Sequence, residues 1–180
     1  MNLAHKIVAI HKSLTRARLP HAFGGALALA WCTHRARGTI DIDLNVFITT
    51  AETELLVGAL PKWIEWRDAD LLAINRDGQV RLWCDGTPLD LFLNTTDIHE
   101  GLVHRIRWEQ FAGQTIPFLS CTDLAIFKAF FNRTKDWADL EEMQLAGTLE
   151  TDRVLAVITR YLGADDERIE HLRSIASNRF

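Results

Sequence analysis

Apolar residues occupy every second position between Ile40 and Ile48. This period of two predicts a β-strand with one buried face, because successive side chains of a strand point to opposite sides. The opposite face of the same strand carries Asp41, Asp43 and Asn45. Its two carboxylates therefore point the same way, and like charges so close repel each other unless a cation lies between them. The segment thus predicts both a buried sheet and a cation site.

A pair of glycines before this strand predicts a binding site for an anion. Gly24 and Gly25 permit a tight approach of the backbone, and the apolar run from Ala26 to Trp31 predicts a helix that begins at the pair. The free N–H groups and the positive dipole end of such a helix favour phosphate. Carboxylates suit Mg²⁺ or Mn²⁺, and Mg²⁺ takes one or two of them and completes its shell with substrate phosphates. Turn and strand together predict a site for a metal and a nucleotide.

The order of strand, Gly-Gly turn, helix and Asp-x-Asp strand resembles the nucleotidyltransferase superfamily that includes DNA polymerase β. The residues that match it are Gly24, Gly25, Arg37, Thr39, Asp41 and Asp43. The likeness is greatest to the small bacterial branch, which contains lincosamide-type antibiotic nucleotidyltransferases and AbiEii-like toxins. Many members have Ser where this chain has Gly25, so a hydroxyl contact to phosphate is missing here.

The resemblance implies an α/β (α+β) fold, in which a mixed β-sheet is flanked by helices and further helices follow at the C-terminus. We expect a nucleotidyltransferase core over residues 1–120, and a helical region over residues 121–180 that packs on it as a single compact unit. The implied activity is the metal-dependent transfer of a nucleoside monophosphate from a nucleoside triphosphate, such as ATP, to an acceptor hydroxyl. Asp41 and Asp43 are implied as catalytic metal ligands. The residues implied in nucleotide binding are Gly24, Gly25, Arg37, Thr39 and Lys128.

A second alternating segment supplies a third carboxylate. Between Leu89 and Leu93 the leucines share one face, whereas Asp90 and Phe92 share the other. An acidic oxygen there could ligate the metal or accept the proton of the attacking hydroxyl. Because the superfamily often places a carboxylate on a neighbouring strand, the resemblance implies Asp90 as a metal ligand and catalytic residue. Asp85 is a competing candidate, but it precedes a glycine in a turn and fits a structural role better.

A lysine interrupts the apolar helix predicted from Leu124 to Phe131. An unpaired ammonium is costly in such surroundings, so Lys128 requires a phosphate or a carboxylate partner. The segment around it resembles a Lys and Lys/Arg-Asp-x-x-Asp-Leu motif of the bacterial branch. That likeness implies phosphate binding by Lys128 and a catalytic or positioning role for Asp136. The alternative is an internal ion pair of Lys128 with Asp136 or with Asp139. We expect Asp139 to be structural.

Charge is unevenly distributed along the chain. The net charge is −4, yet residues 1–40 contain no acidic residue and six basic ones: Lys6, Lys12, Arg16, Arg18, Arg35 and Arg37. Basic residues beside a phosphate turn favour RNA, for example tRNA, as the acceptor. The likeness to the toxins agrees with this and implies a possible antitoxin partner. The alternatives are transfer to a small molecule such as an antibiotic, and a non-catalytic nucleotide-binding module of the same fold.

Cysteine usage and hydropathy predict the compartment. The three cysteines are far apart and lack a CxxC motif, which favours buried free thiols in a reducing cytosol over disulfides or zinc. Apolar runs in the sequence fall short of the roughly 18 residues that span a bilayer. We therefore expect a cytoplasmic protein without a membrane partner.

Turn residues predict two hairpins and the last two helices. The turn signal at residues 76–78 predicts a hairpin between strands at 71–75 and 79–84, and another hairpin is expected around residues 113–114. Amphipathic helices are expected at residues 151–162 and 166–176, separated at Gly163.

Overall fold

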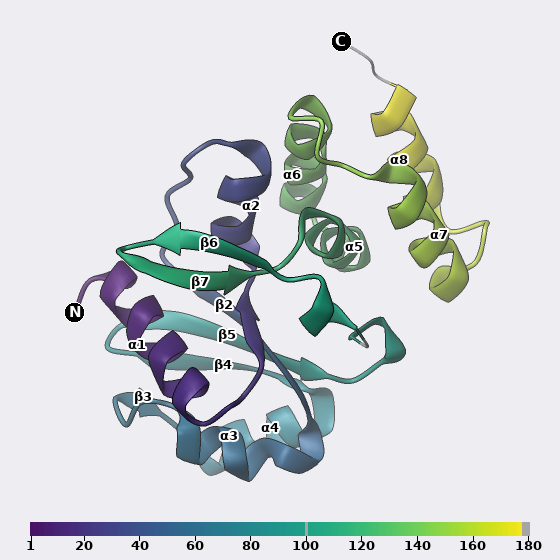
Figure 1. Ribbon diagram of the computed structural model, residues 1–180. Coiled ribbons are helices and arrows are strands. Elements are labelled where there is room, and N and C mark those ends of the chain that lie inside the picture. Colours follow the sequence, from purple (N-terminus) through teal and green to yellow (C-terminus); the bar gives the residue numbers. More distant parts are fainter. Residues whose placement is uncertain (100, 178–180) are drawn as a thin grey trace. The chain divides into compact units, whose positions relative to one another are not determined.

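The structure, a computed structural model, describes residues 1–99 and 101–177 (Figure 1). These residues form two compact units. The first unit comprises residues 1–27 and 38–119, and the second comprises residues 28–37 together with the chain from residue 120. The elements of the first unit, in chain order, are α1 (Leu3–Arg16), β1 (His21–Phe23), the start of α2 (Gly25–Thr33), β2 (Ile42–Thr49), η1 (Thr50–Glu52), α3 (Thr53–Ala59), β3 (Ile64–Glu65), α4 (Asp68–Asp77), β4 (Gln79–Cys84), β5 (Thr87–Asn94), η2 (Asp97–His99), η3 (Leu102–His104), β6 (Arg107–Phe111) and β7 (Gln114–Phe118). The second unit contains the rest of α2, α5 (Cys121–Phe131), α6 (Thr134–Leu145), α7 (Thr151–Leu162) and α8 (Glu167–Ser177).

The first unit is built on a mixed sheet. Over the described residues the sheet has seven strands in the order β3-β4-β5-β2-β1-β7-β6. Strand β2 pairs parallel with β5 and antiparallel with β1, and β1 pairs parallel with β7. A mixed sheet with flanking helices is the predicted fold class, which is therefore confirmed.

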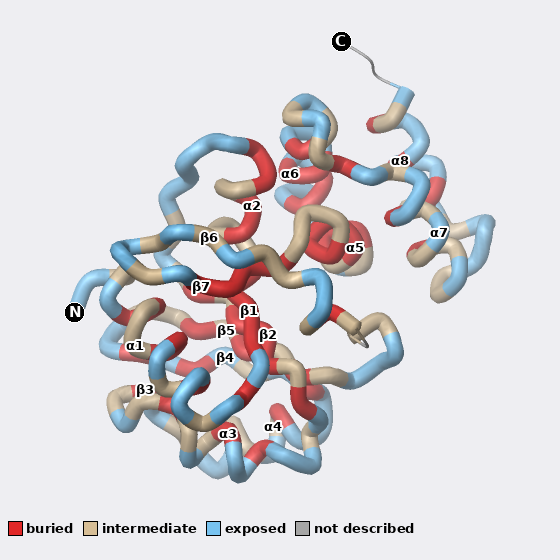
Figure 2. Tube along the Cα trace, in the orientation of Figure 1, coloured by how far each residue is buried: buried red, intermediate tan, exposed pale blue. Residues whose placement is uncertain are grey.

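The alternation in the sequence explains the core of this sheet. The apolar face of β2 and β5 is buried, as Figure 2 shows in red for both strands. Its buried residues are Ile42, Leu44, Val46, Ile48, Leu89, Leu91 and Leu93. Ile40 departs from the prediction, because it is 82% exposed. The ladder with β5 starts at Ile42, so Ile40 precedes the paired strand and no neighbouring strand covers it.

The predicted hairpin at residues 71–84 is wrong, because residues 68–77 form helix α4. The backbone N–H of Arg67 donates to Asp70 at 2.9 Å, which caps the start of the helix. Gly78 ends it with a φ of +66°, and its N–H donates to the carbonyl of Ile74 at 2.8 Å. The glycine of the presumed turn is thus a helix C-cap. A hairpin follows instead between β4 and β5, where Asp85 and Gly86 form the turn.

Other predicted elements are confirmed. Strands β6 and β7 form the hairpin expected around residues 113–114, and α7 and α8 match the two expected C-terminal helices. Helix α5 begins earlier than predicted, at Cys121, because the hydroxyl of Ser120 accepts a hydrogen bond from the backbone N–H of Asp123 at 3.1 Å.

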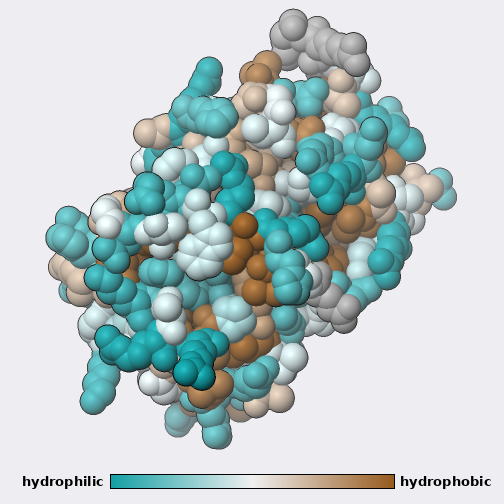
Figure 3. Space-filling view, in the orientation of Figure 1, coloured by the Kyte–Doolittle hydropathy of each residue, from teal (hydrophilic) through white to brown (hydrophobic). Residues whose placement is uncertain are grey.

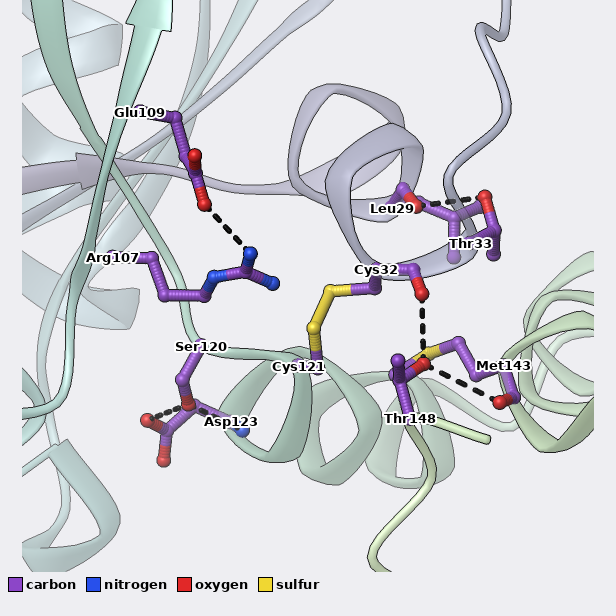
Figure 4. Close-up of a disulfide and its surroundings, with 10 residues drawn as sticks. All are labelled: Leu29, Cys32, Thr33, Arg107, Glu109, Ser120, Cys121, Asp123, Met143 and Thr148. Atoms are coloured by element: carbon purple, nitrogen blue, oxygen red, sulfur yellow. Dashed lines mark hydrogen bonds and ion pairs between the residues drawn. A yellow bond between two sulfur atoms is a disulfide. The ribbon is translucent and has the colours of Figure 1, made fainter. Parts of the chain in front are cut away.

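A disulfide corrects the prediction of free thiols. Cys32, near the end of α2, is bonded to Cys121, the first residue of α5 (Figure 4). The hydroxyl of Thr148 donates to the carbonyl of Cys32 at 2.9 Å, which adds a second link at the same end of α2. The two cysteines are 89 positions apart, so spacing in the sequence carries no sign of their contact. Cys84 is a buried free thiol, as predicted.

No helix in the described ranges is both long enough and apolar enough to cross a membrane. Hydrophilic residues cover much of the molecular face seen in Figure 3, interrupted by smaller hydrophobic areas.

Candidate active site

The Gly-Gly turn and the Asp-x-Asp strand are in direct contact. Strand β1 ends at Phe23, and the N–H of Gly24 donates to the carbonyl of Asp43 at 2.9 Å. Gly25 begins α2 with a φ of +52°, and a Cβ added there would stand 1.7 Å from a carboxylate oxygen of Asp43. Only glycine fits at this position, because its neighbour already fills the space of a side chain. A serine at this position would collide with Asp43.

Pairing across three strands aligns charged residues on one face of the sheet. In the parallel pair of β2 and β5, Asp43 lies opposite Asp90. In the antiparallel pair of β4 and β5, Asp90 lies opposite Arg81. Residues directly opposite each other on paired strands share a face. Arg81, Asp90 and Asp43 therefore form a row across the sheet, which we call the charged row, and Gly24 lies beyond its Asp43 end.

Arg81 binds Asp90 through both carboxylate oxygens. Its Nε donates to Oδ1 and its Nη2 donates to Oδ2, each at 2.6 Å. Hydrogen bonding to Asp90, and then its charge, raise the pKa of Arg81, and the charges of Asp41 and Asp43 raise it further. The guanidinium thus lies within the electrostatic field of all three aspartates that the sequence predicted at the site.

Sequence reasoning missed Arg81, although a signal for it exists. A two-residue turn at Asp85 and Gly86 pairs Cys84 with Thr87. Three residues before Cys84 and three residues after Thr87, this register places Arg81 opposite Asp90. The predicted hairpin lies one segment too early in the chain, and this hides the register of β4 with β5.

Thr39 orients the first aspartate. Its hydroxyl donates to Oδ1 of Asp41 at 2.5 Å, and it lies 3.4 Å from the backbone nitrogen of the same residue. Asp41 precedes β2 by one residue, so this contact fixes a carboxylate that the sheet itself does not hold. The contact of Thr39 in the structure is thus with Asp41, and its predicted role in nucleotide binding stays a prediction.

Two carboxylates of the predicted site fit a metal ion that brings further ligands with it. Across residues 1–99 and 101–177, no group of three or more His, Cys, Asp or Glu residues is arranged to hold one. Asp90 directs both oxygens to Arg81, so Asp41 and Asp43 are the carboxylates that would hold an ion. Two carboxylates are what Mg²⁺ takes from a protein when phosphates complete its shell. The pair therefore fits Mg²⁺ or Mn²⁺ that arrives with a nucleotide.

The second unit contains its own charged cluster. Lys128 donates to Asp139 at 2.6 Å and lies 3.6 Å from Asp136, and all three side chains are buried. Arg37 also pairs with Asp139, and Nε of Arg133 donates to Asp136 at 2.6 Å. Burial alone would raise the pKa of Asp136, but the hydrogen bonds of Arg133 and the charges of Lys128 and Arg133 outweigh it and lower the pKa. The internal ion pair weighed as an alternative is thus present. The predicted roles of Lys128, Arg37 and Asp136 at the nucleotide stay predictions.

Comparison with known proteins relates the fold to solved structures. No protein-family model matches the sequence, and no curated protein matches it either. The solution structure of the antibiotic-resistance factor ANT(2'')-Ia superimposes with a TM-score of 0.58 at 17% identity, covering 95% of this chain and 89% of that chain. A crystal structure of ANT(2'')-Ia in complex with adenylyl-2''-tobramycin gives a TM-score of 0.54 at 18% identity, covering 96% and 93%.

A lincomycin-bound structure of the lincosamide antibiotic adenylyltransferase LnuA gives a TM-score of 0.53 at 14% identity, covering 78% of this chain and 95% of that chain. A nucleotidyltransferase-like protein from Paracoccidioides brasiliensis gives 0.54 at 13% identity, covering 95% and 92%. At such identities the comparisons speak to the fold. This chain has the nucleotidyltransferase fold.

Proposed function

We propose that this chain is a metal-dependent nucleotidyltransferase that passes a nucleoside monophosphate from a nucleoside triphosphate to an acceptor hydroxyl. The observation that carries the proposal is the contact of Asp43 with Gly25. It puts a carboxylate of the predicted metal pair against the first residue of α2, where helix N–H groups favour phosphate. The fold, shared with enzymes of this class, supports the same reading.

The predicted aspartates and glycines of the first unit each have a place in this proposal. Asp41 and Asp43 would hold Mg²⁺ or Mn²⁺, which neutralises phosphate charge and makes pyrophosphate a better leaving group. Gly24 and Gly25 would let the triphosphate approach the backbone. The acceptor oxygen attacks the α-phosphorus as the bond to pyrophosphate breaks, and its proton passes to Asp90. Both oxygens of Asp90 keep a lone pair after binding Arg81, so the carboxylate can accept that proton.

We favour a small hydroxylated compound over RNA as the acceptor. Two of the six basic residues that favoured RNA bind other groups of the protein itself. Lys6 is buried and donates to the carbonyls of Cys84 and Asp85 at 2.8 and 2.7 Å, and Arg37 pairs with Asp139. Solved structures of the same fold contain lincomycin or adenylyl-2''-tobramycin, which supports a small acceptor.

RNA stays the second candidate, because the other four basic residues are exposed: Lys12, Arg16, Arg18 and Arg35. Exposed basic side chains can neutralise phosphates of an RNA backbone. An antitoxin partner belongs to this candidate alone.

The deciding experiment incubates the pure protein and Mg²⁺ with each labelled nucleoside triphosphate and three groups of acceptors: aminoglycosides, lincosamides and total tRNA. We expect label on a small acceptor and release of pyrophosphate, both abolished by Asp41→Asn combined with Asp43→Asn. Label on tRNA would instead favour the second candidate. Nucleotide binding without transfer to any acceptor would favour a non-catalytic module.

A further inference from the structure

The charged row contains a cation that belongs to the protein itself. Arg81 lies opposite Asp90 on the neighbouring strand and occupies both of its oxygens, while Asp43 lies opposite Asp90 on the other side. The carboxylate of Asp90 lies between a guanidinium and a second carboxylate, so two arrangements are open to it. It can stay with the guanidinium or turn toward a metal held by its neighbour.

We propose that Arg81 is a positioning residue that holds Asp90 out of the metal shell and competes with the divalent ion for it. The inference rests on the proposed function, because it concerns the metal site of that reaction. A two-pronged pair of an arginine with a carboxylate fixes direction as well as distance. Arg81 thereby reserves Asp90 as a proton acceptor and leaves the metal to Asp41 and Asp43.

The chain contains another arginine that binds an aspartate through two nitrogens. Arg168, in the first turn of α8, binds Asp166 through two nitrogens, at 2.7 and 2.8 Å, and also donates to the carbonyl of Phe130. Neither residue of this pair belongs to the predicted site. Arg81 differs because its partner lies directly opposite a predicted metal ligand. The Arg168 pair therefore provides a matched control of the same chemistry.

The test is the affinity of the nucleotide-free protein for Mn²⁺, measured by electron paramagnetic resonance of the free ion. In Arg81→Gln, Asp90 becomes available and a positive charge is lost, so we expect Mn²⁺ to bind tighter by about tenfold, the scale of outer-shell effects on metal affinity. Arg81→Lys keeps the charge but not the two-pronged contact, and should lie between wild type and Arg81→Gln. Arg168→Gln should leave the affinity unchanged.

A double-mutant cycle separates position from charge. If Asp90 is the ligand released, the gain of Arg81→Gln disappears in Arg81→Gln combined with Asp90→Asn. A gain that persists in the double variant, or Mn²⁺ affinity unchanged in Arg81→Gln, overturns the inference. Failure of the proposed function gives a different result, because wild type would then bind no Mn²⁺ that Asp41→Asn with Asp43→Asn removes. Arg81 is 55% exposed at its side chain, and circular dichroism checks that each variant folds.

Discussion

The carboxylate of Asp43 lies against the Cα of Gly25, in the space that any side chain at position 25 would need. We predict that Gly25→Ser weakens metal binding and does not restore a phosphate contact. A Cβ would displace Asp43, and the left-handed φ adds roughly 1–2 kcal/mol of strain. Mn²⁺ titration and urea unfolding measure the two effects.

Gly58→Ala is the control for this change, because that glycine lies in α3 with no atom near its missing side chain. Its stability should rise by roughly 0.5–1 kcal/mol with Mn²⁺ affinity unchanged. Undiminished Mn²⁺ affinity in Gly25→Ser would contradict the contact between turn and strand.

A second prediction concerns the buried lysine of α5. Lys128→Met keeps much of the volume but leaves Asp136 and Asp139 without their shared ammonium. We expect a loss of about 3 kcal/mol in the free energy of unfolding, the lower end of the cost of removing one partner from a buried ion pair, because Arg133 and Arg37 still pair with the two carboxylates. Lys135→Met, at an exposed position of α6, should cost less than 0.5 kcal/mol.

Nucleotide affinity, measured on the same two variants, tests the other reading of Lys128. Normal stability together with weaker triphosphate binding would favour phosphate binding and argue against a structural ion pair.

The third prediction concerns pH. Nδ1 of His21 donates to the carbonyl of Leu19 at 2.8 Å, so its Nε2 accepts from Nδ1 of His11 at 2.9 Å when both rings are neutral. Burial, more than the charge of His11, lowers the pKa of His21 from 6.5 to about 4 despite the Leu19 contact. The unfolded chain then binds more protons than the folded one between these values. Stability is therefore complete above pH 6.5 and is lost as the pH falls toward 4, by about 3 kcal/mol.

Urea unfolding at a series of pH values measures this loss. His21→Phe cannot titrate and should flatten the profile over this range, whereas His5→Gln, at an exposed position of α1, should leave it as in wild type. An equal slope in His21→Phe would assign the loss to other groups.

The fourth prediction concerns the disulfide. Replacing Cys32 and Cys121 together by Ser should lower the free energy of unfolding by about 4–5 kcal/mol, because the bond closes a loop of 89 residues that otherwise gains freedom on unfolding. A dithiol reductant should have the same effect on wild type and none on the double variant. Cys84→Ser separates loss of the bond from loss of a buried sulfur, since Cys84 is a free thiol.

Patterns within short segments of the sequence predicted strands, helix starts and the faces on which their side chains lie. Alternation placed Asp43 and Asp90 on the polar faces of their strands, and the Gly-Gly pair marked the start of α2. The hairpin predicted at Gly78 was wrong, because a glycine with positive φ ends a helix as readily as it forms a turn. Contacts between distant segments, such as Cys32 with Cys121, leave no periodic trace in the sequence. The partners of Lys128 follow within the same segment of the chain, so the sequence could name Asp136 and Asp139, and the structure pairs Lys128 with both.

The position of β1 in the sheet has a consequence for synthesis on the ribosome. Three residues of β1 join β2 to β7, with Phe23 paired to Phe118, so this central strand leaves the ribosome long before one of its two neighbours. At usual rates of translation the wait is about 5–20 s. During that time the β1 edge exposes backbone donors and acceptors to any other extended chain. A nascent-chain chaperone that shields Phe23 would therefore act before residue 118 emerges and have no binding site afterwards.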